Sequence, residues 1–326
     1  MPVTGAFIYI LSELDLNMDK ILVVDQVTKE YPGRVAVSDI SFQVNQGSIH
    51  GFLGPNGAGK STTMRMIAGM MPSSSGSIQL FGQKVNPENF DLRNQLGLLP
   101  ENAPLYLDMK VENYIQYVAR LHQVKNPKEQ TDKVMEELSL TEVKGRLIGN
   151  LSKGYKQRVG LAQAIVYDAP FLMLDEPTNG LDPQTVVELR DFIKKLSLKK
   201  TILFSSHVLS EVEQLCDHIT IIHKGKIRAS GDLREIHRKF RQGLVIKLGL
   251  GLGETLPDLG EFGKYEVNHH STLASEEQFL VTFESEADIR SDLGKFIFSR
   301  GLKLMTLHVE SPELEDIFLH MTETRK

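Results

Sequence analysis

The sequence GPNGAGKST at positions 54–62 constrains the fold of this chain more than any other segment. It follows the apolar run IHGFL, which is typical of a buried strand, and precedes TTMRMIAGM, which has the apolar spacing of a helix. Its glycines let backbone N–H groups wrap around a phosphate, and the helix that follows adds the positive end of its dipole. A strand, a glycine-rich loop and a helix in this order predict an α/β domain with a phosphate-binding loop.

Two side chains of this loop have specific chemistry. The ammonium of Lys60 would neutralise the β- and γ-phosphates of ATP, and the hydroxyl of Ser61 would hold Mg²⁺. The sequence therefore predicts ATP and Mg²⁺ as ligands. The residues expected to contact the nucleotide here are Gly54, Pro55, Asn56, Gly57, Ala58, Gly59, Lys60, Ser61 and Thr62.

A second candidate element is FLMLDEP at 171–177. Its four apolar residues predict a buried strand, and Asp175 and Glu176 follow at the carboxyl end, where α/β sheets bind ligands. Asp175 suits a contact to Mg²⁺, directly or through water. Glu176 suits polarising an attacking water molecule, a role that typically contributes about 10²–10⁴-fold in rate. An acidic pair after a strand is more often simply solvated, and the loop upstream favours the catalytic interpretation.

Residues 20–230 alternate short β-branched runs with helical patterns, which predicts an α/β fold with a largely parallel sheet. Lys60 and Asp175 are 115 positions apart, too far for one simple crossover, so we expect a helical insert at about 101–165. The expected elements are the helical stretch 113–140 and the strands 21–27, 47–53, 96–100, 171–175, 201–206 and 219–225.

Residues 231–326 are expected to form a small accessory α+β domain that opens with the helix DLREIHRKF. The piece GLGLGETLP has the wrong glycine spacing for a dinucleotide-binding loop and is expected to be an ordinary loop. His269 and His270 are adjacent, so on a strand they would face opposite sides and could not easily share a metal. The expected strands are 244–248, 278–283 and 302–309, and the apolar helical stripes are Ile289, Leu293, Phe296 and Ile297, then Leu314, Ile317, Phe318 and Met321.

Composition limits the possible functions. Of 326 residues, 41% are apolar and 24% are charged, and the net charge of −5 argues against nucleic acid as a partner. The single cysteine, Cys216, cannot form a disulfide within the chain, which fits a reducing cytosol. No run approaches the ~20 apolar residues of a membrane-spanning helix, so a membrane role is expected to come through a partner. Residues 1–19 are expected to be an N-terminal extension, with Met18 as an alternative start.

The order of these motifs resembles that of the nucleotide-binding subunits of ABC transporters, over roughly residues 20–230. The phosphate-binding loop, LSKGYKQRVGLAQAI at 151–165, FLMLDEP and SSHVLSEVEQLCDHI stand in the family's order. In LSKGY, at the place of the family's LSGGQ signature, Ser152 is expected to cap a helix. The resemblance implies two such domains that meet head to tail, with Ser152 and Gly154 contacting the γ-phosphate bound by the other domain.

The resemblance assigns roles to further positions. Tyr31 is expected to stack on adenine, and His207 to contact the γ-phosphate. Glu101 stands where the family usually has a glutamine that senses Mg²⁺ and the attacking water. The NGLD sequence at 179–182 is similar to the loop that communicates across the dimer. The expected catalytic residues are Glu176, His207 and Glu101, and the expected metal ligands are Ser61, Asp175 and Glu101.

Lys153 and Tyr155 replace the glycine and glutamine of the common signature. Together with Glu101 they resemble the subfamily whose membrane partners are ABC-2-type exporters, and the ending SPELEDIFLHMT resembles that subfamily's closing segment. The signature is also similar to ATPase subunits labelled with gliding motility. The resemblance implies an ATPase that powers export through a separate integral-membrane permease. It further implies a homodimer or heterodimer that is cytoplasmic and peripheral on the inner face of the cell membrane.

Other functions use some of the same residues. A regulatory ABC ATPase, which transmits conformational change to a membrane protein without moving solute, needs the same set and stays open as an alternative. Soluble ABC proteins of translation usually have two cassettes, and those of DNA repair have a long coiled coil or a zinc insert, neither of which this sequence contains. A phosphate-loop kinase would need neither the signature nor His207.

Overall fold

The computed structural model describes residues 8–9, 20–86, 88–240, 244–273, 275–284, 287–310, 314–315 and 317–318. These residues form two compact units, divided between Arg234 and Glu235. Each unit has a hydrophobic core of its own. Within the described ranges, no helix is both long and apolar enough to cross a bilayer.

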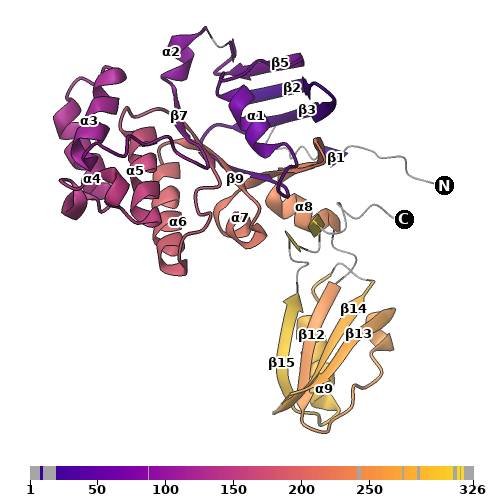
Figure 1. The fold of residues 1–326 in the computed structure, drawn as a ribbon. Helices are drawn as coiled ribbons and strands as arrows, with labels where there is room; N and C mark the ends of the chain where they lie inside the picture. The colour runs from indigo at the N-terminus through magenta and orange to yellow at the C-terminus, as the bar shows by residue number, and fades with distance from the viewer. Residues whose placement is uncertain are drawn as a thin grey trace. The chain divides into compact units, whose positions relative to one another are not determined.

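The larger unit contains a sheet that has seven strands over the described residues, in the order β1-β11-β10-β4-β9-β8-β7. Its strands β1, β9 and β7 are labelled in Figure 1. From β10 to β7 the neighbouring strands are parallel, whereas β11 is antiparallel to β10. The central strands β4, β8 and β9 are buried along their whole length, as expected for parallel strands covered on both faces. The strands are β1 (Ile8–Tyr9), β4 (Ile49–Leu53), β7 (Leu96–Leu99), β8 (Phe171–Asp175), β9 (Thr201–Ser206), β10 (His218–His223) and β11 (Lys226–Asp232).

A second, antiparallel sheet in this unit has the order β3-β2-β5-β6. The sequence predicted only residues 21–27 as a strand here, so the largely parallel arrangement holds for the first sheet alone. Helix α1 (Lys60–Ile67) contacts β3 and β5 of this sheet and β8 of the other, and Met64 and Met66 lie in the core that it shares with both. The strands are β2 (Lys20–Tyr31), β3 (Arg34–Asn45), β5 (Ser75–Leu80) and β6 (Gln83–Lys84).

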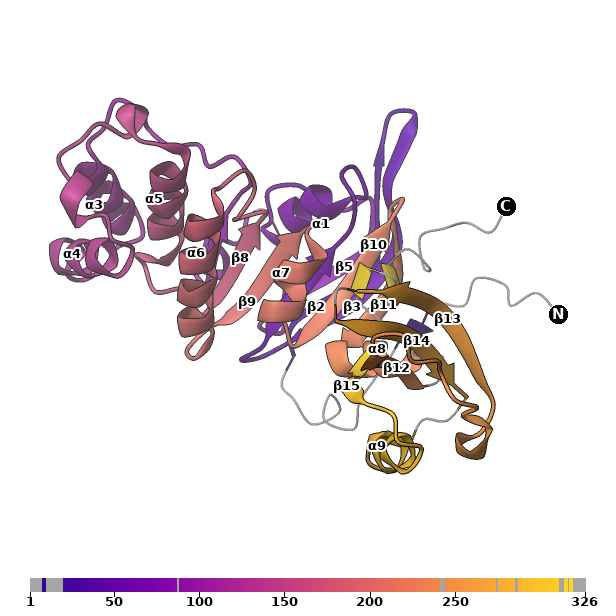
Figure 2. The ribbon, with the colours of Figure 1, turned by 90° about the horizontal axis from the view of Figure 1, so that it is seen from below.

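The stretch 113–140, which the sequence predicted to be helical, contains two helices rather than one continuous helix. It is divided into α3 (Val111–Leu121) and α4 (Pro127–Glu137), because Gln123 has a φ of 56° and Pro127 favours a helix start. Helices α3, α4 and α5 (Lys153–Ile165) pack together, and α6 (Pro183–Ser197) lies beside α5 (Figure 2). The remaining short helices are α2 (Phe90–Arg93), the 3-10 turns Thr141–Val143 and Ile148–Asn150, and α7 (Leu209–Leu215).

The smaller unit has an antiparallel sheet in the order β13-β14-β12-β15. Inward-facing residues alternate along β14 and pack with apolar residues of α9, as the stripe that includes Leu293 and Ile297 predicted. Part of the predicted glycine-rich loop is strand as far as Gly251, and β13, which carries His269 and His270, was not among the expected strands. The elements are α8 (Leu233–Phe240), at the division between the units, then β12 (Leu244–Gly251), a 3-10 turn (Gly260–Phe262), β13 (Tyr265–Thr272), β14 (Glu276–Phe283), α9 (Arg290–Ser299) and β15 (Leu304–Glu310).

The closing apolar stripe is described only in part. Leu314 and Ile317 are helical and buried, Phe318 is helical and half-buried, and Met321 lies outside the described residues. Of the predicted extension 1–19, the described part is β1, which pairs with Ala229 and Ser230 of β11.

Candidate functional site

Residues 54–62 form a loop that follows β4 and leads into α1. Gly57 and Gly59 have φ angles of 78° and 113°, which glycine adopts without steric cost. Gly54 is required for a different reason, because a Cβ atom there would lie 2.3 Å from the carbonyl oxygen of Ile222. The first N–H groups of α1 have no acceptor within the helix. The loop therefore has the backbone geometry that an anion needs.

Lys60 and Glu176 form a buried ion pair, with 3.0 Å between Nζ and Oε1 and both side chains only 5% exposed. The Lys60 ammonium also donates to the carbonyl of Gly54 at 2.6 Å. The other oxygen of Glu176, Oε2, lies 2.6 Å from Nδ1 of His207. A hydrogen bond at this distance to a carboxylate oxygen requires the His207 ring to donate from Nδ1. The phosphate-binding loop and His207 therefore meet at the carboxylate of Glu176.

Asp175 ends β8 and lies beside the last residues of β9. The hydroxyl of Ser205 donates to its Oδ1 at 2.5 Å. Burial raises the pKa of the Asp175 carboxyl above its usual range, the hydroxyls of Ser205 and Ser61 oppose this rise, and the negative charges of Glu176 and Glu101 add to it. Asp175 is thus a buried acid that nearby negative charge makes harder to ionise.

The backbone of Glu176 has a φ of 49°, a left-handed conformation that is uncommon outside glycine. Its N–H group donates to Ser205 twice, to the carbonyl at 3.2 Å and to the hydroxyl at 3.0 Å. Two acceptors on β9 therefore hold the point where the chain leaves β8. This local backbone turn aims the Glu176 carboxylate at Lys60 and His207.

A cavity of about 550 Å³ opens beside these groups. Tyr31, 41% exposed, lies at this cavity, and its hydroxyl contacts the sulfur of Met71 at 3.5 Å. Glu101 also lines the cavity and accepts a hydrogen bond from the side-chain amide of Asn179 at 3.2 Å. The lining residues are Tyr31, Pro32, Arg34, Ala36, Asn56, Gly57, Gly59, Lys60, Ser61, Thr62, Glu101 and Glu176.

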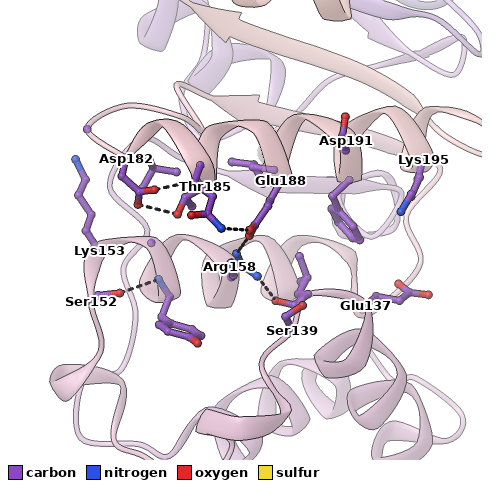
Figure 3. Close-up of a pocket in the computed structure, with 18 residues that line it drawn as sticks. Glu137, Ser139, Ser152, Lys153, Arg158, Asp182, Thr185, Glu188, Asp191 and Lys195 are labelled. Atoms are coloured by element: carbon purple, nitrogen blue, oxygen red, sulfur yellow. Dashed lines mark hydrogen bonds and ion pairs between the residues drawn. The ribbon is translucent and has the colours of Figure 1, made fainter.

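Ser152 and Gly154 lie elsewhere in this chain, in a separate cavity of about 920 Å³ between α5 and α6 (Figure 3). Ser152 caps α5 as predicted, accepting a hydrogen bond from the N–H of Tyr155 at 3.4 Å. Asp182 caps α6 in the same way by accepting from the N–H of Thr185 at 3.0 Å. Their predicted contact with a γ-phosphate across a dimer stays a prediction, because one chain alone does not bring them to Lys60.

Two residues beside the acidic pair escaped the sequence reasoning. Ser205 binds both Asp175 and Glu176, and Arg34 lines the cavity with Tyr31. Ser205 carried no local signal, since its neighbours are 29 and 30 positions away and meet it only through strand pairing. Arg34 begins β3, directly after the turn that follows Tyr31. A cationic residue so close to the predicted adenine-stacking residue was the sequence signal that could have identified it.

The residues at this cavity fit a nucleotide with Mg²⁺. The loop offers N–H donors and an ammonium for phosphate oxygens, and Ser61 and Asp175 offer hard oxygen ligands for the cation. In the described part of the chain, no group of three His, Cys, Asp or Glu side chains converges to hold a metal.

The raised pKa of Asp175 makes a prediction about stability. The protonated acid is favoured in the folded protein, so its stabilising contribution is full below the pKa of the unfolded chain and is lost as pH rises through the higher folded pKa. At neutral pH, which lies above the pKa of the unfolded chain, the Asp175 carboxyl therefore costs stability. Without nucleotide and Mg²⁺, Asp175→Asn should raise the midpoint of thermal unfolding at neutral pH, and its advantage should shrink as pH falls. The exposed Asp191→Asn on α6 is the matched control, and a lower midpoint for Asp175→Asn at neutral pH would contradict the assignment.

Comparison with known proteins agrees with this geometry. Residues 37–179 match the family described as ABC transporter. The bacitracin transport ATP-binding protein BcrA of Bacillus licheniformis is 32% identical over 311 residues, which cover 93% of this chain and 98% of that protein. The uncharacterized ABC transporter ATP-binding protein YhcH of Bacillus subtilis (strain 168) is 42% identical over 213 residues, 64% of this chain and 69% of that protein.

A solved structure supports the same assignment. The structure of an ATP-binding subunit of an ABC transporter superposes with a TM-score of 0.63 at 30% identity, covering 68% of this chain and 93% of that one. The fold of the larger unit is thus shared with that subunit. The chain belongs to the family of ABC transporter ATP-binding proteins and is an ATPase.

Proposed function

We propose that this subunit hydrolyses Mg-ATP to power export through a separate membrane permease of the ABC-2 type. The observation that carries the proposal is the contact of Lys60 and His207 with the Glu176 carboxylate, beside a cavity that Lys60, Ser61 and Glu176 line, with Asp175 bonded to Ser205 next to them. A relative named for bacitracin transport, matched over nearly its full length, supports a transport role, and the resemblance of LSKGY and Glu101 to exporter subunits supports the direction.

The predicted catalytic and metal-binding residues each have a role in this proposal. Lys60 binds the β- and γ-phosphates, and Ser61 and Asp175 hold Mg²⁺. Glu176 polarises the attacking water, while His207 contacts the γ-phosphate. Glu101 contributes to the cation and water as a carboxylate where the family usually has an amide. Any phosphate that approaches Lys60 must compete with the 3.0 Å contact to Glu176, so nucleotide binding would free the Glu176 carboxylate for water.

A complete site requires a second copy of the domain, either this chain or a related one. Ser152 and Gly154 would complete the site of the opposite subunit, with the N–H groups at the start of α5 facing its γ-phosphate. In the loop 179–182, residues 180–182 line the same cavity as the signature and Asn179 contacts Glu101, so the loop could report on the occupancy of both sites. The accessory unit from Glu235 onward is proposed to support assembly rather than chemistry.

The proposed permease contact is an exposed apolar surface beside the helical insert, which we call the aromatic patch: Tyr106, Leu107 and Tyr117. These side chains are 53%, 51% and 39% exposed, and the Tyr106 ring contacts those of Tyr114 and Tyr117 at centroid distances of 5.7 and 5.9 Å. The alternative is that Tyr106 and Leu107 pack beneath the helical insert, which would bury side chains that are more than half exposed here. Clustered exposed aromatic residues are typical of a partner-binding surface.

The catalytic roles lead to the first prediction of this proposal. Lys60→Ala should abolish nucleotide binding, because the phosphates lose their buried cation. Glu176→Gln should keep binding and lose turnover by roughly 10²-fold or more, because the amide cannot act as a base. Equilibrium binding of a fluorescent ATP analogue and steady-state phosphate release measure the two effects. Hydrolysis by Glu176→Gln at the parent rate would reject the role given to Glu176.

The composite site can be tested by mixing two inactive variants. Ser152→Arg blocks the signature, and Lys60→Ala blocks the phosphate-binding loop, so each homodimer has two defective sites. A mixed dimer retains one site with parent residues on both sides. ATPase activity that reappears on mixing, and rises with the fraction of mixed dimer measured by native mass spectrometry, is the expected result. Mixed dimers without activity would contradict a site shared between subunits.

The aromatic patch predicts a selective loss of the permease. Tyr106→Asp should lower the amount of permease that co-purifies from detergent-solubilised membranes, while ATPase activity of the purified subunit stays near the parent value. Leu198→Asp, at an apolar position that is 83% exposed after α6, is the matched control for an added charge. Undiminished co-purification with Tyr106→Asp would remove the patch from the proposed interface.

A further inference from the structure

A buried carboxylate behind the catalytic acidic pair has no role in the chemistry described so far. Glu211, on α7, is 8% exposed and accepts two hydrogen bonds on the same oxygen, Oε2. The hydroxyl of Thr178 donates at 2.7 Å and that of Ser206 at 3.2 Å. Thr178 lies two residues after Glu176, and Ser206 immediately precedes His207. We infer that Glu211 is a positioning residue for ATP hydrolysis, which fixes the two segments that carry Glu176 and His207.

The Glu176 segment needs such a support. The chain turns sharply after β8, with the N–H of Asn179 donating to the carbonyl of Glu176 at 3.1 Å. Ser205 holds the N–H of Glu176 at the start of this turn, where the backbone is left-handed. Thr178 is held by Glu211 from the other side. A non-glycine residue remains in such a conformation only when its surroundings hold it there, and these two contacts supply that restraint.

The His207 segment is held by the same carboxylate. Ser206 donates to Glu211 through its hydroxyl and accepts from the N–H of Val208 at 2.9 Å. These contacts fix the backbone on both sides of His207. Because Oε2 receives hydroxyls from both segments, a displacement of one segment is transmitted to the other. The 2.6 Å contact between His207 and Glu176 therefore depends on Oε2 of Glu211, which is hydrogen-bonded to the neighbouring residues Thr178 and Ser206.

Glu211 is well placed to affect turnover without affecting nucleotide binding. It is not among the residues that line the 550 Å³ cavity in the described chain, whereas Lys60, Ser61 and Tyr31 are. The nucleotide would be held by these lining residues, whereas Glu211 is hydrogen-bonded to Thr178 and Ser206. Loss of Glu211 should therefore lower kcat and leave KM unchanged. Misplacement of a catalytic group by about 1 Å can cost on the order of 10²-fold in rate.

The experiment compares three substitutions of Glu211 in the full chain. Glu211→Met keeps the length of the side chain and removes both acceptors, so kcat should fall roughly 10- to 100-fold with KM for ATP within about twofold of the parent. Glu211→Gln keeps one oxygen that can accept from both hydroxyls and should recover most of the rate. Glu211→Ala should resemble Glu211→Met. The exposed Glu136→Gln on α4 controls for loss of a carboxylate.

Single donors provide a second measurement if Glu211→Met does not fold. Thr178→Val and Ser206→Ala should each lower kcat, and Thr178→Ser, which keeps the hydroxyl, should recover it. A kcat equal to the parent in Glu211→Met, or in both donor variants, overturns the inference. A parallel loss of nucleotide affinity and kcat also overturns it, since that outcome describes a purely structural residue.

The inference rests on the proposed roles of Glu176 and His207. One further variant separates a failure of the inference from a failure of the proposed function. Glu176→Gln is assayed in parallel. If it loses turnover while Glu211→Met does not, only the positioning role of Glu211 fails. If Glu176→Gln also turns over at the parent rate, the proposed role of Glu176 fails as well.

Discussion

The parallel pairing of β8, β9 and β4 is the constraint on which the site depends. Asp175 at the end of β8 lies opposite Ser205 of β9, and Leu53 at the end of β4 lies opposite Ser206. Because these strands end at one edge of the sheet, the chain segments that follow them emerge side by side. A shift of register by one residue would move Asp175 away from Ser205 and force the side chains that are buried on both faces of these strands to repack. The core therefore fixes the site.

The charges at this edge are not fully balanced without a ligand. Burial of Lys60 and Glu176 costs desolvation energy, which their contact and the hydrogen bonds to Gly54 and His207 offset. Asp175 has hydroxyl partners but no contact with a cation among the described residues, and its pKa is raised. Such groups are retained where function needs them, and a divalent cation with phosphates would stabilise the folded protein by binding to it.

Contacts connect the two cavities of the larger unit. Glu101 at the first cavity is hydrogen-bonded to Asn179, at the start of the loop that ends in the α6 cap Asp182. Further along α6, Glu188 pairs with Arg158 of α5, which also donates to the carbonyl of Leu138 at 3.1 Å (Figure 3). Rigid helices joined by such contacts are a physical route by which the signature region and the nucleotide site could influence each other.

The sequence by itself determined the elements whose signals are local. The phosphate-binding loop, the acidic pair after β8, the cap at Ser152 and the apolar core strands follow from periodicity, glycine spacing and hydrogen-bonding chemistry over a few residues. The turn dividing 113–140 and the second sheet were missed, since pairing among β2, β3 and β5 depends on partners that local patterns do not identify. Only the tertiary structure decided that Ser205 binds Asp175 and Glu176, that Lys60 pairs with Glu176, and that Glu211 joins Thr178 to Ser206. The physical reason is that four of these five contacts join residues separated by 29 to 116 positions, which approach one another only when parallel strands end at a common edge.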